Sequence, residues 1–201
     1  GDTFESFYDG RGNYVVILSD GMGTGPRAAL DSAMASGLMA RLVKAGFGFQ
    51  SALRLVNSSL LLKSRDESLA TLDIVKIDLY TGKAVFYKAG AAPSVIRRQN
   101  GKLLEIKKAA LPAGILRDAT FSSCEGQLEN GDTGIIASDG AYEYAHNAVK
   151  EELQSGGAKR ASTKAKNISL RAKKAKGKAR CDDITVIALN ISGRARREQK
   201  I

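Results

Sequence analysis

The feature of this sequence that most constrains its fold is a set of aspartates placed at the ends of apolar runs. Asp20 and Asp139 each close such a run and are each followed by glycine, while Asp182 opens the run that continues to Leu189. A further aspartate, Asp2, stands near the start of the chain. Carboxylates gathered at the edges of packed strands repel one another unless a cation lies between them, and Mg²⁺ and Mn²⁺ prefer carboxylate, carbonyl and water oxygens. The sequence therefore predicts a metal centre assembled from strand ends.

The hydrophobic periodicity predicts an α+β layered sandwich. Leu30, Met34, Leu38 and Leu42 recur every four residues and indicate the apolar seam of a helix. Strands are expected at 14–18, 71–78, 84–88, 94–98, 102–106, 120–128, 133–138 and 184–190, and helical segments at 26–44, 50–63 and 142–172. A strand, a helix pair, an antiparallel run, a helix and a final strand fit packed sheets flanked by helices better than alternating βαβ units.

Composition bounds the class of protein. The 201 residues suffice for one well-buried domain, which we place at 1–192 and follow with a basic tail at 193–201. No apolar run reaches membrane-spanning length and no signal peptide is visible, and because the chain does not begin with Met we expect a fragment of a longer protein. Cys124 and Cys181 have no CxxC partner and His146 is the only histidine, so disulfide frameworks, zinc sites and histidine-rich active sites are not expected.

The positive charge of the chain is confined to one segment. The net charge is +10, and residues 158–180 hold ten Lys or Arg and no acidic residue, which leaves 21 basic and 21 acidic residues elsewhere. The segment contains no aromatic residue to stack on bases, which argues against nucleic acid. We favour a solvated helix face or a flap beside the active site over nucleic-acid binding, and the segment could also attract an acidic partner or a membrane surface.

Four acidic motifs, taken in order, resemble the metal-dependent protein phosphatase family called PPM or PP2C. The motifs are Gly1-Asp2, Ser19-Asp20-Gly21-Met22-Gly23, Ser138-Asp139-Gly140 and Asp182-Asp183-Ile184-Thr185. The connecting segments that begin at Ser68, Lys88 and Leu111 resemble the bacterial subfamily of stage II sporulation protein E. The resemblance covers about residues 1–192.

The resemblance implies a sandwich of two packed antiparallel β-sheets flanked by helices, with two Mn²⁺ or Mg²⁺ ions at one edge. By motif position, Asp20 would bridge both ions and the Gly21 carbonyl would bind one of them. Asp139 and Asp182 would complete the shell of one ion, and Asp2 would lie near the other. Asp183 would give indirect support at most.

The activity implied by the resemblance is hydrolysis of phosphoserine on a regulatory protein. Two metal ions generate hydroxide from a bridging water, and this hydroxide attacks the phosphoryl group without a protein nucleophile. The implied substrate is a phosphorylated anti-sigma factor antagonist, whose dephosphorylation activates a sporulation sigma factor. An upstream regulatory region of the parent chain and a homodimer are further implied partners, and the implied setting is the cytoplasmic domain of a membrane-anchored parent. The alternative is a catalytically weak pseudophosphatase that docks protein or nucleic acid through residues 158–180.

Overall fold

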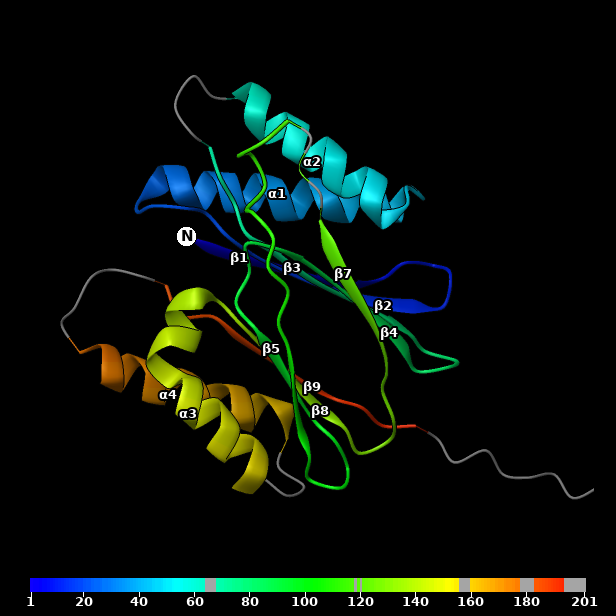
Figure 1. Cartoon of the computed structure of the whole chain (residues 1–201), viewed down its shortest axis with the longest axis vertical. Helices are drawn as coiled ribbons and strands as arrows, with labels where there is room; N and C mark the ends of the chain where they lie inside the picture. Colours follow the sequence, from blue (N-terminus) through cyan, green and yellow to red (C-terminus); the bar gives the residue numbers. More distant parts are fainter. Residues whose placement is uncertain (64–67, 118, 120, 156–159, 178–182, 194–201) are drawn as a thin grey trace, which may run out of the picture.

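The computed structural model describes residues 1–63, 68–117, 119, 121–155, 160–177 and 183–193. Two antiparallel sheets pack face to face, and a pair of helices covers the outer face of each sheet (Figure 1). This four-layer α/β/β/α arrangement confirms the expected sandwich. The boundary predicted between the domain and its tail stays a prediction, because all of the tail except Gly193 lies outside the described residues.

In the described part of the chain, the first sheet has the order β1-β2-β3-β4-β7 and the second has the order β6-β5-β8-β9. The strands of the first sheet are β1 (Asp2–Tyr8), β2 (Asn13–Asp20), β3 (Leu72–Asp78), β4 (Lys83–Ala89) and β7 (Ser122–Gln127). Those of the second sheet are β5 (Ser94–Arg97), β6 (Leu103–Ile106), β8 (Thr133–Ala137) and β9 (Val186–Asn190). The chain therefore passes from the first sheet to the second directly after β4.

Alternation along the strands divides the interior into apolar layers. In β2, Val15 and Ile17 pack beneath the first helix pair, whereas Val16 and Leu18 pack between the sheets. Such two-sided burial explains why β2 reads as a continuous apolar run. The same strand continues to Asp20, so its apolar residues fix the place at which that carboxylate emerges.

The first helix pair matches the predicted ranges but not the predicted packing. These helices are α1 (Pro26–Lys44) and α2 (Phe49–Lys63). The expected seam of α1 is wrong at Leu30, which is 58% exposed. The buried face of α1 is lined instead by Ala28, Asp31, Ser32, Ala35, Ser36, Met39, Ala40 and Val43. Mostly small side chains on this face let the helix lie close to the strands, which a seam of leucines would prevent.

Two further elements differ from the sequence-based expectation. The helical segment expected at 142–172 is two helices, α3 (Asp139–Ser155) and α4 (Ala161–Lys176), which pack together against the second sheet. The edge strand β1 was not expected, because its sequence alternates too weakly to stand out. Its pairing is nevertheless complete, from Asp2 opposite Asp20 to Tyr8 opposite Tyr14.

Candidate metal centre

The pairing of β1 with β2 places two carboxylates side by side. Asp2 and Asp20 are direct cross-strand partners at the end of the ladder. Residues directly opposite in an antiparallel pair have their Cβ atoms about 4.5–5.5 Å apart. Like charges in this arrangement are destabilising, so the register itself creates a local excess of negative charge.

Thr71 anchors the backbone of Asp20 on its other side. The Asp20 amide donates to Thr71 Oγ1 at 3.0 Å, and the Thr71 amide donates to the Asp20 carbonyl at 2.8 Å. The Ser19 hydroxyl donates to the Thr71 carbonyl at 2.8 Å. These bonds extend the β2–β3 pairing beyond the regular ladder and hold the aspartate in one position.

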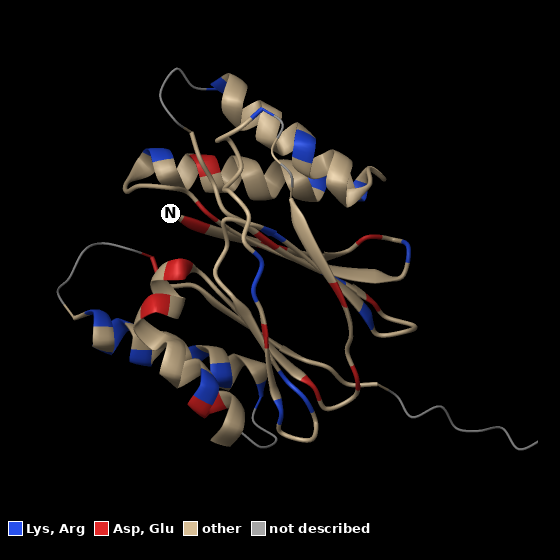
Figure 2. Cartoon of the chain, in the orientation of Figure 1, with Lys and Arg blue, Asp and Glu red and all other residues tan. Residues whose placement is uncertain are grey.

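Asp139 approaches the same point from the other sheet, where it begins α3 directly after β8. Its side chain and that of Asp2 both interact with the Asp20 carboxyl group. Burial, then the contacts with Asp139 and Asp2, raise the pKa of Asp20 to about 9. In Figure 2, several acidic segments lie at the end of the sandwich that carries the chain start, and others are spread over the rest of the fold. The structure thus brings Asp2, Asp20 and Asp139 together, and their binding of metal stays a prediction.

Gly21 is held in a position that admits no side chain. A Cβ atom on Gly21 would lie 1.8 Å from the Ala28 carbonyl oxygen in the first turn of α1. Gly21 also forms an isolated antiparallel bridge with Ala70. The start of α1 therefore packs directly on the turn that follows Asp20. Coordination by the Gly21 carbonyl stays a prediction.

The fourth predicted ligand, Asp182, lies outside the described residues. Its neighbour Asp183 is described, and its Oδ2 accepts a hydrogen bond from the Asp2 amide at 3.4 Å. Ser138 ties this segment to the end of β8, because its amide donates to the Thr185 carbonyl at 3.0 Å and its hydroxyl accepts from the Thr185 amide at 3.1 Å. The described part of this segment, from Asp183 onward, therefore approaches the other carboxylates.

Sequence reasoning did not single out Thr71, and it named Ser138 only as part of an acidic motif. The available signal was the repeated Ser-Asp-Gly motif, because in both copies the serine hydroxyl forms a hydrogen bond with the neighbouring segment. The serine fixes the strand end, and the aspartate that follows it points into the site. Asp183, expected to give indirect support at most, contacts the backbone of the predicted ligand Asp2.

The residues present fit divalent metal ions. Both carboxylate oxygens of Asp2 are buried and lack a hydrogen-bond partner among the described residues. Buried carboxylate oxygens without a donor are costly unless a cation compensates them. In the described part of the chain no three acidic, histidine or cysteine side chains form a complete metal-binding group. Further oxygen donors, of which Asp182 is the predicted protein ligand, are needed to complete such a centre.

The fold and this edge define a class, the PP2C-type metal-dependent phosphatases. Residues 10–192 match the family model described as stage II sporulation protein E, or SpoIIE. The chain belongs to this family. It is 34% identical over 153 residues to stage II sporulation protein E of Bacillus subtilis and equally identical to that of Priestia megaterium. The match covers 76% of this chain but only 18% and 26% of those two relatives.

Solved structures agree with this assignment. The PP2C phosphatase domain of Bacillus subtilis SpoIIE, solved with a fragment of its regulatory domain, matches with a TM-score of 0.84 and 28% identity. That match covers 96% of this chain and 59% of the other. A serine/threonine phosphatase of S. agalactiae shares the fold with a TM-score of 0.81 at 18% identity, covering 94% and 93%. RsbX, solved in complex with magnesium, shares it with a TM-score of 0.71 at 20% identity, covering 93% and 85%.

Proposed function

We propose that this chain is a Mn²⁺- or Mg²⁺-dependent protein serine phosphatase domain that hydrolyses phosphoserine on a regulatory protein. The observation that carries the proposal is the convergence of Asp2, Asp20 and Asp139, from both sheets, on one edge where buried carboxylate oxygens lack donors. Membership of the stage II sporulation protein E family supports it. The substrate we propose is a phosphorylated anti-sigma factor antagonist, in line with the family.

Residues from both sheets would supply the ligands of such a centre. Asp2 and Asp20 would hold metal from the first sheet and Asp139 from the second, with the Gly21 carbonyl and Asp182 as proposed further ligands. When bound, two such ions lower the pKa of a water molecule and offset the charge that develops on the phosphoryl oxygens. Asp20 is 8% exposed whereas Asp139 is exposed, so a phosphoserine would approach from the side of Asp139.

Metal removal tests this proposal. We expect the chain to release phosphate from p-nitrophenyl phosphate in the presence of Mn²⁺, to lose this activity in EDTA and to regain it when Mn²⁺ is restored. The activity should depend on metal because bound metal ions would supply the activated water. Phosphate release that persists in EDTA would contradict the metal mechanism. Mn²⁺ binding without hydrolysis of the aryl phosphate or of a phosphoserine protein would instead support the pseudophosphatase alternative.

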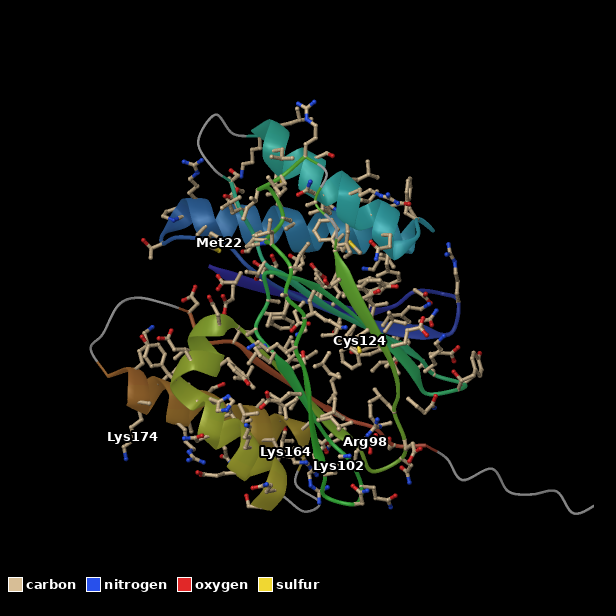
Figure 3. The ribbon with its side chains drawn as sticks, viewed as in Figure 1. Met22, Arg98, Lys102, Cys124, Lys164 and Lys174 are labelled. Carbon is tan, nitrogen blue, oxygen red and sulfur yellow. The ribbon has the colours of Figure 1, made fainter. Side chains whose placement is uncertain are left out.

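Helix α4 offers a surface for the proposed protein substrate. Lys166, Leu170, Lys173 and Lys174 are exposed at helical spacing on one face, with Leu170 55% exposed among the lysines. None of these lysines forms an ion pair with another described residue. Lys174 points outward in Figure 3. We define these four residues as the α4 basic face.

Only part of the basic segment belongs to this face. Lys164 is 2% exposed and its ammonium donates to Thr133 Oγ1 at 3.1 Å, so it serves packing against the second sheet. Arg171 pairs with Glu151 at 2.6 Å. The charge of Lys176, in the last turn of α4, acts on Asp183 beside the metal edge. The partner that suits the α4 basic face is therefore a phosphoprotein with an acidic surface.

Charge reversal tests this docking surface. In Lys166→Glu/Lys173→Glu/Lys174→Glu, we expect KM for a phosphorylated anti-sigma factor antagonist to rise about tenfold, because rim charges steer encounter. Turnover of p-nitrophenyl phosphate should stay within about twofold, and added salt should reduce the difference between variant and wild type. The matched control is Arg41→Glu/Arg54→Glu/Lys102→Glu, which makes the same charge change at exposed positions elsewhere. Equal effects of both variants on KM would contradict a specific docking role for the α4 basic face. Salt-sensitive DNA binding by the wild type that is lost only in the α4 variant would instead indicate that nucleic acid is the ligand of this face.

The location of the parent protein stays a prediction. No helix in the described part of the chain is long and apolar enough to cross a bilayer. We retain the cytoplasmic domain of a membrane-anchored protein, an upstream regulatory region and a homodimer as proposals that follow from family membership.

A further inference from the structure

A fully buried ion pair lies between the two sheets. Lys88 Nζ is 2.5 Å from Asp73 Oδ2, and the side chains are 0% and 2% exposed. The same ammonium donates to the Ala92 carbonyl and to Ser94 Oγ, both at 2.7 Å, so its three protons are used. The Ser94 hydroxyl donates in turn to Asp73 Oδ2 at 3.1 Å. We call Asp73, Lys88 and Ser94 the inter-sheet clamp.

The inter-sheet clamp joins the two strands that lie next to the ligand-bearing strands. Asp73 is on β3, which pairs with β2, the strand that ends at Asp20. Ser94 is on β5, which pairs with β8, the strand that precedes Asp139. Asp20 and Asp139 belong to different sheets, so the separation of the sheets at this edge sets the distance between them. The clamp spans that separation with directional bonds, whereas the apolar layer around it has none.

The clamp also borders the metal edge directly. A small cavity of about 10 Å³, room for one water at most, is lined by Asp73 together with Thr71, Ser138 and Asp139. Asp73 Oδ1 is buried and has no hydrogen-bond partner among the described residues. Asp73 and Asp139 thus line the same small cavity at the edge of the site.

Stability alone does not account for such a pair. Taking two charges out of water costs several kcal/mol per ion, and apolar replacements of buried ion pairs are often neutral or stabilising. Burial indeed raises the pKa of the Asp73 carboxyl, against the opposing effect of the Lys88 ammonium. If this part of the interior served stability alone, we would expect apolar side chains here, as in the rest of the layer.

We propose that the inter-sheet clamp is a positioning element that fixes the separation of Asp20 and Asp139 and so sets the affinity of the metal centre. The inference rests on the proposed metal centre and assigns a task to residues that touch neither metal nor substrate. Groups behind metal ligands typically change metal affinity 10–100-fold when they are altered. The clamp should therefore affect metal binding far more than folding.

The test is the uncharged double variant Asp73→Asn/Lys88→Met, which keeps side-chain volume close to that of the wild type. We expect the Kd for Mn²⁺, measured by calorimetry and by EPR of free Mn²⁺, to rise about 10–100-fold. The EPR line shape of bound Mn²⁺ should also change, because the ligand geometry is altered. The midpoint of thermal unfolding of the metal-free protein should stay close to that of the wild type.

The matched control is Arg98→Met/Asp132→Asn, a second pair with a buried carboxylate. Arg98 Nη1 is 2.7 Å from Asp132 Oδ2, and Asp132 precedes β8 at the end opposite Asp139 (Figure 3 labels Arg98). This variant should leave the Kd for Mn²⁺ within about threefold of wild type. If the clamp double variant does not fold, Ser94→Ala removes one bond only and should still raise Kd more than the control does.

The outcomes separate the clamp from the metal centre. A folded clamp variant with the wild-type Kd and line shape would overturn the positioning role and leave the metal centre standing. A wild-type protein that binds no Mn²⁺ would overturn both. An equal loss of affinity in the Arg98–Asp132 control would show that any buried pair acts in this way, and the specific assignment to the clamp would fall.

Discussion

Asp20→Asn is expected to reduce Mn²⁺-dependent phosphate release at least about 100-fold, measured with p-nitrophenyl phosphate at saturating metal. Asp20 is the carboxylate on which Asp2 and Asp139 converge, and its backbone is fixed by Thr71. Metal-ion charge stabilisation supplies several kcal/mol to such reactions, and each 1.36 kcal/mol corresponds to a factor of ten in rate. The loss should therefore appear in turnover and not in the fold.

The control for this variant is Glu143→Gln, which removes one exposed carboxylate from α3 without touching the three converging aspartates. It should keep near wild-type activity. Metal-free Asp20→Asn should unfold at a temperature equal to or above that of metal-free wild type at alkaline pH, because it removes repulsion between neighbouring carboxylates. Near wild-type turnover of Asp20→Asn at saturating Mn²⁺ would refute the assignment of the centre.

The second large effect is expected in the pH dependence of the metal-free protein and of its metal affinity. The folded state raises the pKa of Asp20 from 3.8 to about 9, through burial and the nearby carboxylates Asp139 and Asp2. Between these values the folded state binds more protons than the unfolded state, so the stability of the metal-free protein should fall as pH rises from about 4 to about 9. Asp20, Asp139 and Asp2 share this proton, so the titration belongs to the three carboxylates together.

Metal binding requires ionised ligands, so the proton held by the carboxylate cluster must be released when metal binds. Apparent Mg²⁺ affinity should therefore rise with pH, by up to about tenfold per unit, and level off near pH 9. Calorimetry in buffers of different ionisation enthalpy should detect about one proton released per binding event at pH 7. An affinity that is flat between pH 6 and pH 8, with no proton released, would show that Asp20 is already ionised in the metal-free protein.

Much of the fold and part of the site could be predicted from local sequence patterns. The apolar run of β2 and the strands expected at 94–98 and 102–106 indicate their elements directly, because strand patterning is a property of a few consecutive residues. The repeated Ser-Asp-Gly motif and the order of the acidic motifs likewise pointed to Asp20 and Asp139 as site residues. These features depend only on the order of residues within each strand and turn, and the sequence states that order directly.

Other features were decided only by the tertiary structure. The pairing that sets Asp2 beside Asp20, the exposure of Leu30 and the burial of Lys164 depend on which surfaces meet, and long-range packing overrides local pattern. The clamp is the clearest case, because Asp73 and Lys88 are 15 residues apart and each is only one of several polar residues in its strand. By itself the sequence determined where the carboxylates emerge from the strands, whereas the packing of the two sheets decided which of them meet and what lies behind them.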